Sequence, residues 1–251
     1  MMLDDKERLR YSRHLLLKEV GEQGQLKLKN AHVAVIGCGG LGCPALFYLA
    51  ASGIGSLTFV DDDQVELSNL QRQILYKVSH IGQAKSKAAS KILASLNNSI
   101  SLNPICTKLT ADNIDTLLAN ADIVLDCSDN FKTRYLLNHY CFVQQKVLIS
   151  GAAIATSGQV MCFDFRSDSP CYACIFPKVQ KEENNNCDNF GVLSPLLGVI
   201  GAQQALLATN TVLGHHSGSY FASTEGLTLK QSVWKVSKNP ECKVCAHEEK
   251  Q

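Results

Sequence analysis

The sequence predicts an α/β fold: a mostly parallel sheet with helices on both faces. Short apolar runs alternate with stretches of helical periodicity along the first 150 residues, a pattern typical of parallel strands joined by helical crossovers. A glycine-rich turn follows the first apolar run, and two Cys-x-x-Cys pairs lie in the last third of the chain. These observations predict a Rossmann-like body whose antiparallel C-terminal continuation is tied down by a four-cysteine zinc site.

The periodicity places each element in order. Two helices open the chain, at 6–17 and 22–29. The strands of the body are predicted at 32–36, 56–60, 101–106, 122–127 and 146–150. The helices between them are predicted at 42–52, 83–96, 111–119 and 132–144. Further along we expect a strand at 159–165, a polar loop at 178–189, a buried helix at 192–213 and short antiparallel runs at 219–223, 227–229 and 232–236.

Length and charge indicate the organisation. The 251 residues form one predicted domain, with N-terminal helices at 1–30, a nucleotide-binding part at 31–151 and a zinc-binding part at 152–251. A net charge of +1 predicts no nucleic-acid partner and no attraction to an anionic membrane. The N-terminus has no apolar signal core, and polar residues interrupt the 192–213 stretch, so we expect a cytoplasmic protein without a membrane span.

The glycine-rich turn predicts a nucleotide site. Its pattern G-x-G-x-x-G supplies bare backbone N–H groups and a helix N-terminus, which suit a phosphate, through Gly37, Gly39, Gly40 and Gly42. Asp61 ends the next predicted strand, 19 residues after Gly42, where a ribose-binding carboxylate belongs. On these residues alone, a nicotinamide or flavin dinucleotide would be the expected ligand.

Charged residues after the second and fourth strands favour a triphosphate instead. Arg72 and Lys85 form a pair of cations that a pyrophosphate rarely needs, although either could be a solvated surface charge. Asp129 follows the fourth strand at the edge where ligands bind, so it could hold Mg²⁺ or could cap the next helix. Asp126 could equally cap a helix or pair with a lysine.

The eleven cysteines divide into three groups. Two pairs, Cys171 with Cys174 and Cys242 with Cys245, have the spacing of one closed tetrahedral zinc site. Such a site would not be catalytic. The alternative is that the pairs are redox motifs or unpaired thiols. Six are predicted to be small buried hydrophobic residues: Cys38, Cys43, Cys106, Cys127, Cys141 and Cys162. Cys187 lies in the polar loop and could be a nucleophile or an inert surface cysteine.

Taken together, the motifs resemble those of the ThiF/MoeB/HesA family of ubiquitin-activating-enzyme-like proteins. The resemblance runs from the R-Y-x-R segment at Arg10 to Cys245. It includes G-x-G-G-L-G, S-N-L-x-R-Q at 68–73, D-C-x-D-N at 126–130, S-G-A at 150–152 and both cysteine pairs. The resemblance implies an enzyme that uses ATP and Mg²⁺ to adenylate the C-terminal glycine of a ubiquitin-like sulfur carrier, bound by the 152–251 part.

The resemblance also implies roles for single residues. Gly40 would approach the phosphates, Asp61 would hold the ribose, and Asn69, Arg72 and Lys85 would bind the triphosphate. Asp129 would carry Mg²⁺, Arg13 would reach the terminal phosphate from the partner subunit of a homodimer, and Cys187 would bond to the activated carrier. The nucleotide-binding set is completed by Asp63, Ser68, Ser128 and Asn130.

The partners follow from the same resemblance: a carrier with a Gly-Gly end, a second copy of the chain and a sulfur donor such as a desulfurase persulfide. The segments 61–63 and 74–76 favour the thiamine pathway. The alternative is the same reaction on the sulfur-carrier subunit of molybdopterin synthase. More distant alternatives are an NAD- or FAD-dependent oxidoreductase and a non-catalytic adapter.

Overall fold

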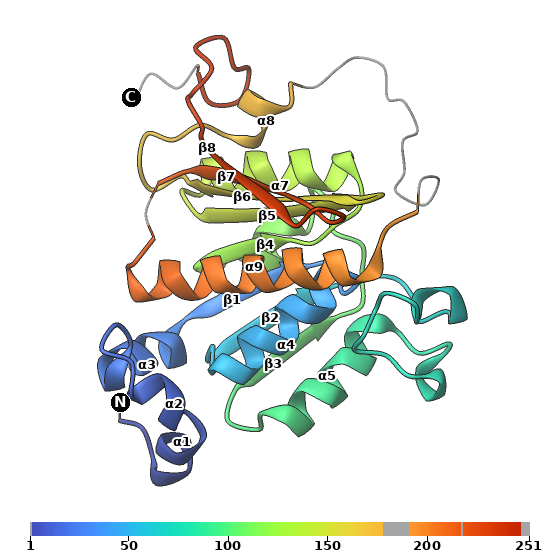
Figure 1. Ribbon diagram of the computed structural model, residues 1–251, viewed down its shortest axis with the longest axis vertical. Helices are drawn as coiled ribbons and strands as arrows, with labels where there is room; N and C mark the ends of the chain where they lie inside the picture. Colours follow the sequence, from blue (N-terminus) through green and yellow to red (C-terminus); the bar gives the residue numbers. More distant parts are fainter. Residues whose placement is uncertain (1, 178–190, 217, 247–251) are drawn as a thin grey trace.

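The computed structural model describes residues 2–177, 191–216 and 218–246. One sheet of eight strands runs through it in the order β3-β2-β1-β4-β5-β6-β7-β8 (Figure 1). The bounds are β1 His32–Ile36, β2 Ser56–Val60, β3 Ser101–Ile105, β4 Ile123–Asp126, β5 Val147–Ile154, β6 Ser157–Asp164, β7 Tyr220–Glu225 and β8 Lys230–Lys235. The first five strands pair in parallel and the last three extend the sheet antiparallel, which confirms the predicted fold class.

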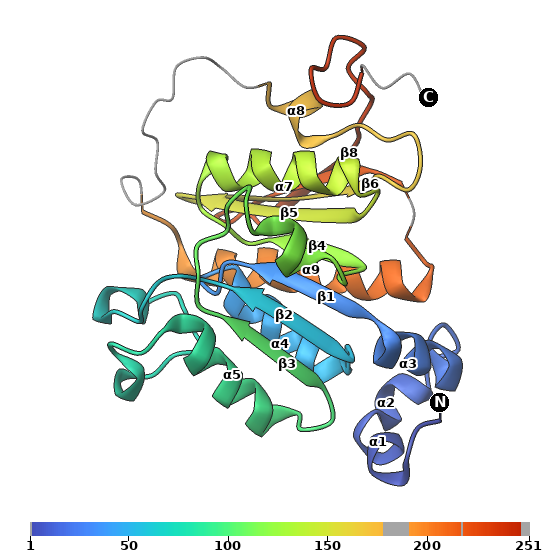
Figure 2. The same cartoon turned by 180° about the vertical axis from the view of Figure 1, so that it is seen from behind.

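Helices cover both faces of this sheet (Figures 1 and 2). Side chains alternate along each strand, so β1 sends Val33 and Val35 into one hydrophobic core and Ala34 and Ile36 into the other. The first core packs under α3 Gly21–Asn30, α4 Gly42–Ser52, α5 Lys85–Leu96 and α9 Ser194–Leu213. The second packs under α6 Ile114–Leu118, α7 Phe131–Val143 and α8 Tyr172–Ile175.

The long apolar helix α9 is part of the first core. Among the described residues it alone has the length and hydropathy of a membrane span, and 56% of its apolar window is buried inside the fold. It lies across α4, β5 and β6. Gly201 lets it approach α4, because a Cβ there would lie 2.4 Å from the carbonyl oxygen of Leu41. The structure therefore uses α9 as the buried helix that the sequence predicts.

The single opening helix predicted at 6–17 is wrong. The chain forms two short helices, α1 Asp5–Arg10 and α2 Ser12–Leu15, with Tyr11 between them. The Tyr11 side chain is buried, and its hydroxyl accepts a hydrogen bond from Nδ2 of the buried Asn97 at 2.9 Å. The break between the two helices places the Tyr11 ring against the body of the protein. A Cβ at Gly53 would lie 2.6 Å from this ring, so only glycine leaves room for it.

Two further predictions fail. Residues 227–229 form the turn between β7 and β8 rather than a strand, and Leu227 and Leu229 point into solvent. The pairing of Glu225 with Lys230 leaves four residues for the connection, and Leu229 takes a positive φ of 58°. Cys106 is exposed instead of buried, because it follows the last residue of the edge strand β3; the other five cysteines of its predicted group are buried.

Candidate functional site

A cavity of about 700 Å³ opens at the carboxyl ends of β1, β2 and β4. Ligands of open α/β sheets bind at this edge. The cavity gathers most of the residues that the sequence analysis selected: Gly37, Gly39, Gly40, Asp61, Asp63, Arg72, Lys85, Ser128, Asp129 and Asn130. Folding therefore assembles segments from four separate parts of the sequence at one place.

The glycines of the turn differ in what a side chain would meet at each position. Gly37 has a φ of 96°, and a Cβ at Gly42 would lie 1.9 Å from the carbonyl oxygen of Gly37. A Cβ at Gly40 would meet Leu197 of α9 at 2.6 Å, whereas at Gly39 the nearest atom is 3.6 Å away. Gly42 does not line the cavity, so the turn itself requires that this position has no side chain. Gly39 borders the cavity, and an added Cβ there would meet no atom closer than 3.6 Å.

Alanine substitutions should separate these roles. We expect Gly42→Ala to destabilise the protein by about 3 kcal/mol or more, because its Cβ overlaps backbone that cannot move aside. Gly39→Ala should change stability by less than about 1 kcal/mol but weaken nucleotide binding, since a methyl group enters the cavity. Urea unfolding and ATP calorimetry measure the two effects. Equal stability of both variants would contradict this assignment.

Asp61 is fixed against the glycine turn. Its carboxylate accepts hydrogen bonds from the backbone N–H of Cys38 at 2.7 Å and of Asp63 at 2.9 Å. Burial raises the pKa of Asp61, while these two hydrogen bonds and the nearby Lys85 act against the increase. The carboxylate is thus held rigidly at the end of β2, where the hydroxyl groups of a ribose can reach it.

Lys85 places a buried positive charge at the cavity. Its side chain is 7% exposed, and Nζ lies 2.8 Å from Oδ2 of Asp63. Burial lowers the pKa of Lys85, but Asp63, Asp61 and Asp129 outweigh burial, so the pKa is raised. The amine therefore stays protonated at neutral pH. Arg72 adds a half-buried guanidinium, held by its hydrogen bond to the carbonyl oxygen of Ser68 at 3.1 Å.

The two acidic residues after β4 have different roles. Asp126 is fully buried and accepts hydrogen bonds from the hydroxyls of Ser128 at 2.6 Å and Ser150 at 2.8 Å, so it holds the strand end together. Asp129 is exposed and lines the cavity. The cap of α7 is Asn130, which accepts from the N–H of Thr133 at 2.9 Å. The capping alternative for Asp129 is therefore wrong, and its carboxylate suits a hard divalent cation such as Mg²⁺.

Some predicted residues lie outside the cavity lining. Asn69 caps the short 3₁₀ helix η1 Leu67–Asn69 by accepting from the N–H of Glu66 at 3.1 Å, and the hydroxyl of Ser68 donates to Glu66. Both residues support the loop that presents Arg72. Arg13 is exposed on α2 and does not line the cavity of its own chain. Cys187 lies outside the described residues.

Sequence reasoning missed several residues that line the cavity. These are Gln73, Thr107, Lys108, Thr133 and Arg134. Thr107 and Lys108 follow β3, so the rule that strand ends meet at one edge could have found them. Arg134 carried no such signal, because it lies inside α7 and reaches the cavity only through the orientation of that helix.

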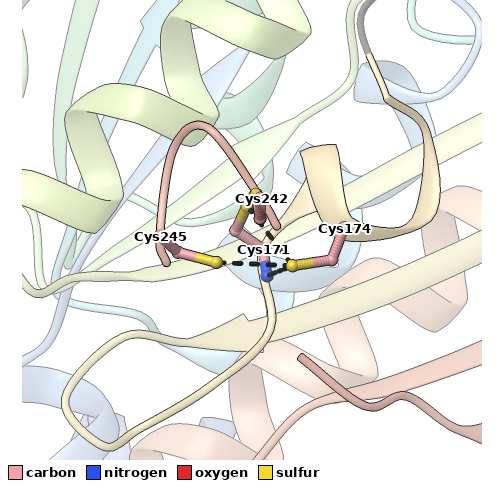
Figure 3. Close-up of side chains that lie close together, drawn as sticks. All are labelled: Cys171, Cys174, Cys242 and Cys245. Carbon is pink, nitrogen blue, oxygen red and sulfur yellow. Dashed lines mark hydrogen bonds between the residues drawn. The ribbon is translucent and has the colours of Figure 1, made fainter. Parts of the chain in front are cut away.

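The four cysteines of the two pairs form one cluster (Figure 3). Their Sγ atoms all lie within 4.8 Å of one another, with Cys171 and Cys242 at 3.5 Å and Cys174 and Cys245 at 3.3 Å. A tetrahedral ion with metal–sulfur bonds of about 2.3 Å needs sulfurs about 3.8 Å apart. The cluster fits such an ion, and it joins the start of α8 to the segment after β8.

Comparisons with known proteins agree with this geometry. Molybdopterin-synthase adenylyltransferase of Salmonella typhimurium is 40% identical over 245 residues, which is 97% of this chain and 98% of that protein. Adenylyltransferase and sulfurtransferase MOCS3 of Culex quinquefasciatus is 46% identical over 214 residues, 85% of this chain. That match covers 49% of the MOCS3 protein, so the chain spans about half the length of this relative.

Solved structures show the same fold. The crystal structure of E. coli MccB with ATP matches with a TM-score of 0.80 and 26% identity, covering 95% of this chain and 75% of that one. A family model described as the ThiF family matches residues 11–244. The chain therefore belongs to the ThiF family, as an enzyme of the adenylyltransferase type.

Proposed function

We propose that this enzyme uses ATP to adenylate the C-terminal carboxylate of a ubiquitin-like sulfur-carrier protein. The observation that carries the proposal is the cavity in which the glycine turn, Asp61, Lys85, Arg72 and Asp129 lie together. A site for a nucleoside triphosphate combines backbone donors for the phosphates, an acid for the ribose, cations and a carboxylate that can bind a metal ion. The neighbour MccB, crystallised with ATP, supports the choice of nucleotide.

The cations of the cavity reduce the electrostatic repulsion between the two reactants. A carboxylate must approach an α-phosphate that is already negative, and two unit charges 4 Å apart interact by about 1 kcal/mol in water and about 4 kcal/mol in a partly shielded site. Lys85 and Arg72 offset this repulsion and stabilise the charge that builds up in the transition state. Asp129 would hold Mg²⁺, which neutralises phosphate charge when bound. A carrier carboxylate is ionised at pH 7, so the reaction needs no general base.

The sulfur carrier we propose is that of molybdopterin synthase. The relatives named for that pathway support this alternative over the thiamine pathway, which the segments 61–63 and 74–76 favoured. The proposal also places zinc in the cysteine cluster. It includes a cytoplasmic homodimer in which Arg13 reaches the cavity of the partner subunit. Cys187 would bond to the activated carrier, and a persulfide would donate the sulfur.

A single-turnover experiment with two carriers tests the proposal. The enzyme is incubated with ATP, Mg²⁺ and either the molybdopterin-synthase carrier or the thiamine-pathway carrier, each ending in Gly-Gly. We expect mass spectrometry to detect the acyl-adenylate of the first carrier, with at least about 10-fold faster pyrophosphate release, equivalent to 1.4 kcal/mol of selectivity. Faster adenylation of the second carrier would restore the thiamine pathway.

The same samples separate the distant alternatives. No adenylate with either carrier, together with tighter binding of NAD⁺ than of ATP, would favour the oxidoreductase. Carrier binding without pyrophosphate release would favour the non-catalytic adapter.

A further inference from the structure

Tyr76 is a buried residue of the segment between β2 and α5, and its side chain joins the glycine turn to the start of α5. Its hydroxyl donates a hydrogen bond at 2.7 Å to the carbonyl oxygen of Cys38, in the glycine turn. The same hydroxyl lies 3.3 Å from the carbonyl oxygen of Lys85, on the first turn of α5. Tyr76 itself does not line the cavity. Any influence on a ligand must therefore pass through the backbone that it holds.

The backbone of Cys38 is held from both sides. Its N–H donates to Oδ2 of Asp61 at 2.7 Å, and its carbonyl oxygen accepts from Tyr76. The thiol of Cys43 lies 3.4 Å from the same carbonyl oxygen and is a weaker second donor. Cys38 is fully buried, so water does not compete for these groups. The two peptide planes that meet at Cys38 are thus both fixed.

Fixing the Cys38 carbonyl also fixes the N–H of Gly39, because both groups belong to one rigid peptide plane. In this trans peptide the C=O and the N–H point in opposite directions, so the Gly39 N–H points away from Tyr76. It donates no hydrogen bond within the described part of the chain, and Gly39 lines the cavity. An unused N–H with a fixed direction at the cavity wall is a donor suited to an anionic ligand.

The Lys85 segment is held just as firmly. The backbone N–H of Lys85 donates to the carbonyl oxygen of Asp63 at 2.9 Å, and Nζ donates to Oδ2 of the same residue at 2.8 Å. The Tyr76 hydroxyl adds a contact at the carbonyl oxygen of Lys85. Tyr76 therefore fixes the Gly39 N–H relative to the segment that carries the Lys85 amine.

We propose that Tyr76 is a positioning residue that aims the N–H of Gly39, through the Cys38 carbonyl, at a phosphate oxygen of ATP. This inference rests on the proposed function, which supplies ATP as the ligand. A donor whose direction is already fixed needs no reorganisation when charge builds up on the phosphates in the transition state. Losing the Tyr76 hydroxyl should therefore lower the rate more than the affinity for ATP.

The first test follows the Gly39 amide by NMR in protein made with isotopically labelled glycine. Gly39→Ala identifies the signal, since that variant lacks it. We expect saturating ATP and Mg²⁺, without a carrier, to move the Gly39 proton signal of the wild type downfield, because the amide then donates to a charged phosphate. Tyr76→Phe removes only the hydroxyl and should show less than about half of this movement. A Gly39 signal that does not move in ATP-bound wild type overturns the proposal without any variant.

The second test measures ATP–pyrophosphate exchange with the carrier and has a matched control. Tyr135→Phe also removes a hydroxyl that donates to a backbone carbonyl, that of Phe176 at 2.9 Å, and neither residue lines the cavity. We expect Tyr76→Phe to lower kcat about 10-fold while KM for ATP changes by less than about 3-fold. Tyr135→Phe should keep both constants within about 2-fold of the wild type. Each substitution should lower Tm by roughly 2–4 °C, as for one lost hydrogen bond.

The outcomes separate this inference from the proposed function. A wild-type kcat in Tyr76→Phe, or a full downfield movement of its Gly39 signal, overturns the positioning role even if the enzyme adenylates its carrier. An equal loss of kcat in Tyr135→Phe also overturns it, because the effect then follows from any lost tyrosine hydroxyl. If the Gly39 signal responds as expected but the wild type adenylates neither carrier, the proposed function fails and the role of Tyr76 in ATP binding stands.

Discussion

Replacing Lys85 with methionine should lower ATP–pyrophosphate exchange by roughly 10²–10³-fold, the usual cost of removing one preorganised donor from a charged transition state. The substitution keeps most of the side-chain volume and removes a positive charge that is buried at the cavity wall beside Asp61 and Asp63. The same variant should bind ATP more weakly in calorimetry. The loss has to appear in the rate at saturating ATP as well as in affinity, because Lys85 stabilises charge that increases during the reaction.

The matched control for this variant is Lys87→Met. Lys87 is on the same helix, α5, two residues further on, and its side chain is exposed. We expect its exchange rate to stay within about 2-fold of the wild type, since it lies outside the lining of the cavity. Circular dichroism and thermal melting check that both variants fold. A wild-type rate of ATP–pyrophosphate exchange in a folded Lys85→Met protein would show that Lys85 does not contribute to the reaction.

Breaking the cysteine cluster should have the second large effect. Cys242→Ser removes a ligand, and structural zinc sites in small peptides contribute about 10–16 kcal/mol of apparent binding free energy at pH 7. In this fold the cluster joins α8 to the segment after β8, so its loss should release residues 236–246 while the sheet persists. We expect near-stoichiometric zinc in the wild type, less than about one tenth of that in the variant, and rapid proteolysis after β8.

Cys106→Ser is the control for the cluster variant. Cys106 is exposed after β3 and lies outside the cluster, so its replacement should leave metal content and protease resistance unchanged. Dialysis of the wild type against a strong chelator should reproduce the proteolysis of Cys242→Ser, and added zinc should reverse it. Full metal content in Cys242→Ser would show that the four thiols do not form one site.

The sequence by itself determined most of the architecture of this protein. Hydrophobic periodicity is a local property, so it located the parallel strands and the buried helix 192–213 without any knowledge of their packing. The cysteine spacing likewise predicted a four-thiol cluster. Parallel strands bring their carboxyl ends to one edge, and for that reason residues selected from separate motifs, such as Gly39, Asp61 and Asp129, line a single cavity.

Only the tertiary structure decided which polar side chains are used by the fold and which remain at the cavity. Asp126 and Asn69 are engaged by neighbouring backbone and hydroxyl groups, whereas Asp129 is exposed because Asn130 takes the capping position. The break at Tyr11 depends on Asn97, 86 residues away, and α8 is held against α7 by the hydrogen bond from the Tyr172 N–H to Asn138, 34 residues away. Such pairings form between residues distant in the chain, so no local pattern of residues contains them.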